Sequence, residues 1–128
     1  MKEGFIFIND NIFSTLLAIS EDEQVKGLMF QEPPTPIMTF IYAYPKVNKF
    51  WMKSTPAPLD LIFCNNNQVS QICKGIPYST KIIGEDVPSD LVIELPAGTV
   101  KSSNIKLQDS VGLIKPTIAE LKTLLSKF

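Results

Sequence analysis

The chain's only Trp lies close to a Lys and an Asp in sequence that is otherwise apolar. Trp51, Lys53 and Asp60 could line a shallow pocket, with the indole as a flat apolar wall and the two charges as polar handles. If it is partly desolvated, Lys53 could bind an anion or act as a nucleophile, and Asp60 could orient it. The alternative is an ion pair on an open sheet face, a common surface feature that contributes only about 0.2 to 1 kcal/mol.

Two predicted strands must hold these side chains. Residues 50–54 and 59–64 are rich in aromatic and aliphatic side chains, and two prolines bend the chain between them. The simplest hairpin register sets Lys53 opposite Asp60. Because side chains alternate along a strand, the face with these two charges also carries Trp51 and Ile62, and the opposite face is pure core. The expected core residues of the hairpin are Phe50, Met52, Leu61 and Phe63.

The rest of the chain predicts further strands around this hairpin. Aromatic and β-branched runs bounded by turn residues predict strands at residues 4–8, 12–19, 37–44, 68–74, 90–95 and 110–114. Capping boxes predict a short helix near residues 21–30 and a C-terminal helix at about 117–127. Residues 99–104 could form one helical turn, and residues 75–90 form a long loop. These elements predict a mainly β fold in a single domain of residues 1–128.

Composition argues against several classes of function. A formal net charge of -1 disfavours nucleic-acid binding, because a nucleic-acid site needs a basic patch that neutralises several phosphates. The absence of His removes the usual zinc sites and the nucleophiles that His activates. Glycine-rich phosphate-binding motifs are also missing, so we predict no metal and no cofactor. Asn9, Asp10 and Asn11 interrupt the first apolar run, so we expect no signal peptide, no membrane span and a cytoplasmic protein.

The two cysteines have no spacing that indicates a metal site. Cys64 and Cys73 both fall in predicted strands, and the expected register does not set them opposite one another. We therefore expect small buried hydrophobic side chains and no disulfide between them.

Five short segments of the chain occur in an order and with a spacing that are typical of a known family. They are Gly27-Leu-Met-Phe30, the strand with Met38, Phe50-Trp-Met-Lys-Ser-Thr55, Pro58-Leu-Asp-Leu-Ile62, and Glu94-Leu-Pro-Ala-Gly-Thr-Val100 with Ile105. Together they resemble the uncharacterised family called domain of unknown function 192, over about residues 12–113. The resemblance implies a compact, mostly β fold, an antiparallel sandwich or jelly-roll-like barrel, and no established activity. The predicted C-terminal helix lies beyond it.

The chain departs from the family pattern at two positions. Family members commonly carry Arg where this chain has Gln31, and Asn where it has Ser54. If that Arg serves a binding site, the departure implies weaker anion binding here. Gln31, Thr55 and Glu94 are further candidate ligand-binding residues. A cleft that also gathers Gln31, Thr55 or Glu94 would favour an enzyme, whereas an open convex surface at Lys53 and Asp60 would exclude a site there.

We expect a small, non-catalytic binding or interaction domain that uses the face of Trp51, Lys53 and Asp60. Its partner is an unknown small molecule or protein, with neither nucleic acid nor membrane involved. One alternative is a small enzyme with Lys53 or Asp60 as its reactive group, which the absence of His disfavours. The other is a structural protein that oligomerises through its C-terminal helix. The sequence does not indicate an oligomeric state.

Overall fold

A computed structural model describes residues 1–114 of the chain, which form seven strands and two short helices. In chain order these are β1 (Lys2–Ile8), β2 (Asn11–Ala18), α1 (Glu21–Lys26), β3 (Met38–Val47), β4 (Leu59–Asn65), β5 (Gln68–Gly75), β6 (Pro88–Pro96), α2 (Thr99–Ser102) and β7 (Val111–Ile114). Neither helix of this part is long and apolar enough to cross a membrane. The mainly β character expected from the sequence is confirmed.

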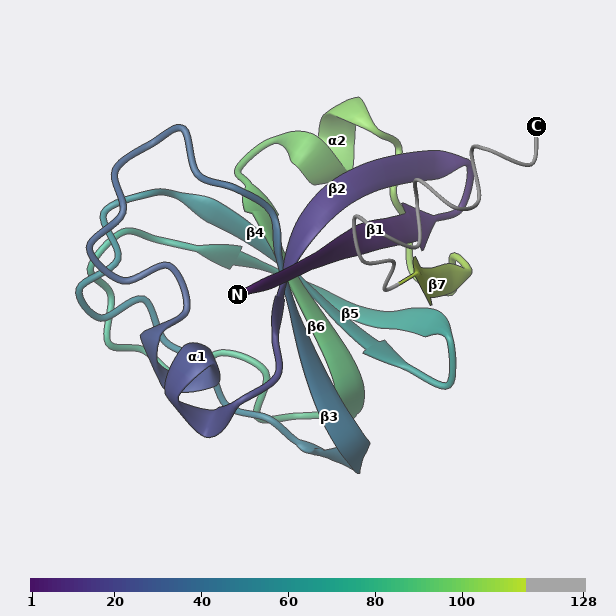
Figure 1. Cartoon of the computed structure of the whole chain (residues 1–128), viewed down its shortest axis with the longest axis horizontal. Coiled ribbons are helices and arrows are strands. Elements are labelled where there is room, and N and C mark those ends of the chain that lie inside the picture. The colour runs from purple at the N-terminus through teal and green to yellow at the C-terminus, as the bar shows by residue number, and fades with distance from the viewer. Residues whose placement is uncertain (115–128) are drawn as a thin grey trace.

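All seven strands join one curled sheet in the order β5-β4-β6-β3-β2-β1-β7 (Figure 1). Every neighbouring pair is antiparallel except β2 and β3, which are parallel, and α1 lies in the connection between these two. The curl brings the two edge strands of the sheet, β5 and β7, close to one another. Val69 of β5 donates to the Asp109 carbonyl at 2.9 Å and accepts from the Gln108 amide at 2.7 Å, immediately before β7. The described residues therefore form a single curled sheet.

Most predicted elements are present within one to three residues of their expected bounds. The first helix begins as its capping box predicts: Ser20 Oγ accepts from the Glu23 amide at 3.2 Å, and the Glu23 carboxylate accepts from the Ser20 amide at 3.0 Å. That helix ends earlier than expected because the chain turns at Gly27, whose φ is +48°. The predicted C-terminal helix at about 117–127 lies outside the described residues.

Both faces of the middle of the sheet are covered. Along β4, Leu59, Leu61 and Phe63 pack into one apolar cluster, whereas Ile62 and Cys64 pack into a second cluster on the other side. The expected core residues of this region are confirmed, with Met52, Leu61 and Phe63 fully buried and Phe50 packed against their cluster. An open sheet face, the alternative considered for the side with Ile62, is not observed, because Ile62 has no exposed surface.

The strand predicted at residues 50–54 is wrong. Phe50 makes an isolated bridge with Ile83, and the Met52 amide donates to the Ser79 carbonyl at 2.9 Å. The chain then turns at Ser54, which has a φ of +56°, instead of folding back along β4. The partner of this segment is thus the long loop that follows β5. The expected hairpin between residues 50–54 and 59–64 does not form, so the register argued from it fails.

Candidate functional site

Asp60 serves the fold and is not paired with Lys53. In the sheet it lies opposite Lys74 on β5 and Leu95 on β6, and only 5% of its surface is exposed. Its Oδ2 accepts hydrogen bonds from the backbone amides of Gly98 at 3.1 Å and Val100 at 3.0 Å. Asp60 thus satisfies two amides at the start of α2, which have no acceptor within that helix. This corrects the expected site, because the carboxylate is already engaged.

Lys53 lies in the turn after Trp51 and is exposed. Its ammonium lies 5.2 Å from the centroid of the Trp51 ring, which is a cation–π contact. The proximity of Trp51 and Lys53 is therefore confirmed, but the shared face with Asp60 is wrong.

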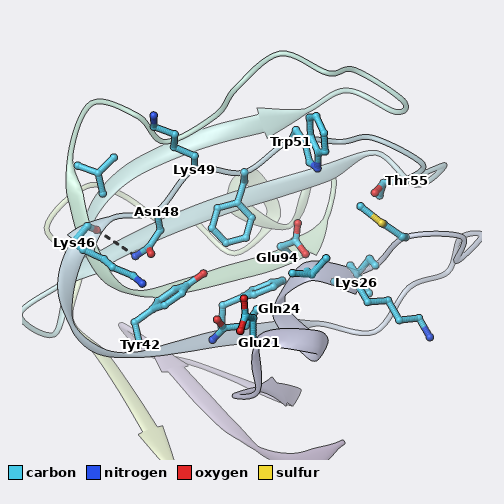
Figure 2. A pocket seen from close by; sticks show the side chains of 17 residues that line it. Glu21, Gln24, Lys26, Tyr42, Lys46, Asn48, Lys49, Trp51, Thr55 and Glu94 are labelled. Carbon is cyan, nitrogen blue, oxygen red and sulfur yellow. Dashed lines mark hydrogen bonds between the residues drawn. The ribbon is translucent and has the colours of Figure 1, made fainter.

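Trp51 also lines a hollow of about 590 Å³, and Lys53 is not part of the lining of this hollow. Its wall is built from α1 and the turn after it, from β3, from the segment Asn48–Thr55, and from one residue of β6. Glu94, the β6 residue, lies between Trp51 on one side and Gln24 on the other (Figure 2). Residues from four separate stretches of the chain thus line one space.

Glu94 is the most unusual residue of this hollow. It is 5% exposed, and among residues 1–114 no hydrogen bond or ion pair to its carboxyl group is found. Burial raises the pKa of Glu94 from 4.5 to about 8, since the charged form loses its hydration. A buried carboxyl group without a protein partner is costly when it is charged, and the Glu94 oxygens keep some surface that a water molecule or a ligand can contact.

The turn after α1 fits closely around this carboxyl group. A Cβ atom on Gly27 would lie 3.5 Å from Glu94 Oε1 and 3.4 Å from Phe40 Cζ. These are ordinary contact distances, so a side chain there would touch both the acid and the ring beside it. The reason for glycine is its φ of +48°, because side-chain-bearing residues rarely adopt that conformation.

Aromatic rings form much of the remaining wall: Phe40, Tyr42, Phe50 and Trp51. Phe40 and Phe50 pack edge to face with centroids 4.9 Å apart. The Tyr42 hydroxyl has a raised pKa because of its burial and because of the nearby Glu94 charge. Trp51 is 43% exposed and stands at the edge of the hollow.

Three uncharged polar side chains also line the hollow, and each uses its N–H or O–H groups within the protein. Gln24 Nε2 donates to the carbonyls of Ala18 and Ile41, at 3.1 and 2.8 Å. Asn48 Nδ2 donates to the Ser89 carbonyl at 2.7 Å, and Thr55 Oγ1 donates to the Lys53 carbonyl at 3.1 Å. The oxygens of these three side chains remain as acceptors.

Three of the six candidates from the sequence line this hollow: Trp51, Thr55 and Glu94. Lys53, Asp60 and Gln31 do not. Sequence reasoning missed Gln24 on α1, Tyr42 on β3 and Asn48 just after β3, because the packing of these segments against one another was not predicted. The signal for Glu94 was a charged residue inside an apolar strand, Leu91 to Leu95, the same signal that singled out Asp60.

A family model described as "DUF192: Uncharacterized ACR" matches residues 6–113. A crystal structure from Sinorhizobium meliloti, named as a "putative transcription regulator", is 27% identical with a TM-score of 0.80, over 87% of this chain and 93% of that one. A protein of unknown function from Novosphingobium aromaticivorans is 29% identical with a TM-score of 0.79, over 84% of this chain and 83% of that one. No curated protein matches the chain.

Proposed function

The chain belongs to the DUF192 family, which is uncharacterised, and from its own geometry we propose that it is a small-molecule binding domain whose ligand occupies the hollow around Glu94. The observation that carries this proposal is the buried Glu94 carboxyl group, which faces the hollow and has no partner among the described residues. The binding function expected from the sequence is kept, and its site moves from Lys53 and Asp60 to Glu94.

The shape and lining of the hollow support binding. Its volume of about 590 Å³ falls within the usual range for sites that take small organic molecules. Such sites are mostly apolar with a few polar groups that fix orientation. Four aromatic rings, the buried carboxyl group of Glu94 and the oxygens of Gln24, Asn48 and Thr55 fit that description, and Glu21 adds an exposed carboxyl group.

The name of the Sinorhizobium meliloti structure is compatible with this proposal. A regulator commonly needs a domain that senses a small molecule, and a binding domain of this size could serve that purpose. The net charge of -1 gives this chain no general attraction for nucleic acid, so we do not propose that it contacts DNA itself.

A fragment screen followed by Trp51 fluorescence tests the proposal, because this residue is the chain's only Trp and stands at the edge of the hollow. We expect hits that change the emission and that shift the NMR signals of Tyr42 and Thr55. A Thr55→Val variant should weaken such hits, and Lys81→Gln, an exposed substitution outside the hollow, serves as the control. Hits confined to the groove beside Asp60 and Ile76 would contradict the proposal.

An enzyme is the second candidate, and one observation favours it. The hollow gathers Trp51, Thr55 and Glu94, and the pKa of Glu94 is raised to about 8, which suits a general acid near neutral pH. Turnover of a bound ligand by the native protein and not by a Glu94→Gln variant that still binds would favour this candidate. A ligand recovered unchanged after long incubation would favour binding alone.

A further inference from the structure

We propose that the ligand of the hollow is an organic cation: an amine whose ammonium group contacts Glu94 and whose apolar body lies on the aromatic rings. This inference rests on the proposed binding function and adds the chemical class of the ligand. Three features of the hollow support it: hydrogen-bond acceptors for which the described residues show no donor, aromatic rings, and lysine side chains that point away from Glu94.

Four polar side chains of the hollow offer acceptors, and the uncharged donors in its lining are the Tyr42 hydroxyl and the Trp51 indole N–H. Gln24, Asn48 and Thr55 each direct their donor groups to backbone carbonyls of the protein. Within residues 1–114 no hydrogen bond is found to their side-chain oxygens, nor to the carboxyl group of Glu94. A ligand with several N–H donors can form hydrogen bonds to these oxygens. A carboxylate or phosphate would instead place its own acceptor oxygens against them.

The aromatic rings suit a cation as well. An ammonium group is attracted to the face of Trp, Tyr or Phe, and more strongly so when water is excluded. Two of the four rings already attract ammonium groups of the chain itself: Lys53 lies 5.2 Å from the Trp51 centroid, and Lys46 lies 5.5 Å from that of Tyr42. Rings around a buried acid thus form a wall that favours positive charge.

Three lysines line the hollow, and they do not neutralise the acid. Lys26 and Lys49 extend away from Glu94 in Figure 2, and both are exposed. Lys46 lies over the rings of Tyr42 and Tyr44, at 5.5 and 5.7 Å from their centroids. These ammonium groups are at the solvent-exposed rim, where water and salt screen their repulsion of a ligand cation. The attraction between that cation and the buried Glu94 carboxylate is screened less.

Binding of a cation would ionise Glu94. In the empty hollow, burial keeps the proton on this carboxyl group up to about pH 8. An ammonium group favours the charged form, so the proton leaves as the ligand enters. The other titratable groups along the hollow are Glu21 and Lys26 of α1, Tyr42 and Lys46 of β3, and Lys49.

Three probes of one shape and different charge test this inference on the full chain: benzylamine, benzyl alcohol and benzoate. Trp51 fluorescence and calorimetry would measure their affinities between pH 6 and pH 8, where benzylamine stays protonated. We expect benzylamine to bind most tightly and benzoate most weakly. The affinity for benzylamine should rise by more than about tenfold from pH 6 to pH 8, because Glu94 loses its proton more easily at the higher pH.

The Glu94→Gln variant provides the second measurement, because it keeps the shape of the side chain and removes its charge. We expect its affinity for benzylamine to fall by more than about tenfold at pH 8 and to lose its pH dependence. Its affinity for benzyl alcohol should change little, which shows that the hollow is intact. Glu3→Gln, at an exposed position on β1, is the matched control.

The outcomes separate this inference from the proposed function. Tighter binding of benzoate than of benzylamine, or a Glu94→Gln variant that binds benzylamine as well as the native protein does, would overturn the ligand class and leave a binding hollow. If all three probes leave Trp51 fluorescence unchanged and the fragment screen also fails there, the binding function and this inference both fail.

Discussion

At the scale of single residues, two buried carboxyl groups of the same sheet have opposite surroundings. Asp60 and Glu94 are each 5% exposed. Asp60 accepts two backbone hydrogen bonds, whereas no partner for Glu94 is found within residues 1–114. The first carboxyl group stabilises the start of a helix, and the second lowers the stability of the fold whenever it is charged. Equal burial therefore accompanies opposite hydrogen bonding at these two carboxyl groups.

Glu94 should make the free energy of unfolding depend on pH. The unfolded chain releases this proton near pH 4.5, whereas the folded protein keeps it up to about pH 8. Stability from this residue is therefore fully present below pH 4.5 and is lost as pH rises towards 8. We expect the Glu94→Gln variant to gain stability over the native protein by about 1 kcal/mol per pH unit across that window.

Urea unfolding of both proteins at several pH values would measure this difference. All other groups titrate in both proteins, so the difference between the two curves isolates Glu94. Two parallel curves from pH 5 to pH 8 would mean that Glu94 is ionised in the folded protein, contrary to its burial.

Asp60 should be important for stability and unimportant for ligand binding. Its replacement in Asp60→Ala leaves the amides of Gly98 and Val100 without their acceptor, which should cost about 2–4 kcal/mol. Lys53→Ala removes one exposed cation–π contact and should cost less than about 1 kcal/mol. Chemical unfolding tests both values, and a loss of ligand binding in a folded Asp60→Ala variant would restore Asp60 as a site residue.

At the scale of elements, local patterns predicted the strands well and their partners less well. The hairpin of β1 and β2 follows from a turn-forming sequence between two β-branched runs, and α1 follows from its capping box. These are contacts between residues close in the chain. The parallel pairing of β2 with β3 joins residues about 20 positions apart, across a proline-rich connection, and no local pattern indicates it.

The segment 50–58 shows why the site itself could be predicted only in part. Its alternation correctly indicated that Phe50 and Met52 are core residues. Its partner is the loop with Ser79 and Ile83, which has no periodicity that predicts pairing. Trp51, Thr55 and Glu94 could thus be named as candidates from their residue types, but their meeting place depends on this long-range pairing.

The turn after α1 gives a prediction at this scale. Gly27→Ala would put a side chain at a φ of +48°, beside Phe40 and Glu94, and should cost about 1–2 kcal/mol while narrowing the hollow. Gly112→Ala is the matched control, because nothing lies within 4 Å of the position its Cβ would take. Thermal unfolding and probe affinity should both fall for the first variant and stay near native values for the second. Equal behaviour of the two variants would contradict the close fit around Glu94.

At the scale of the whole molecule, Glu94 lies on an interior strand of the sheet. β6 is hydrogen-bonded to β4 on one side and to β3 on the other, and β3 also supplies Phe40 and Tyr42. Glu94 therefore enters the hollow from a strand that is paired on both sides, and the turn after α1 lies beside it. Rigid strands of this kind hold site residues more accurately than loops do.

The position of Glu94 on β6 links ligand binding to backbone amide exchange. Amides of a strand that is paired on both sides exchange with solvent mainly when the sheet opens as a whole. A ligand that binds only the folded protein makes this opening rarer, in proportion to its concentration over its dissociation constant. Deuterium uptake should then slow along β4, β6 and β3 together, including residues such as Ile62 that lie on the far face of the sheet from the hollow.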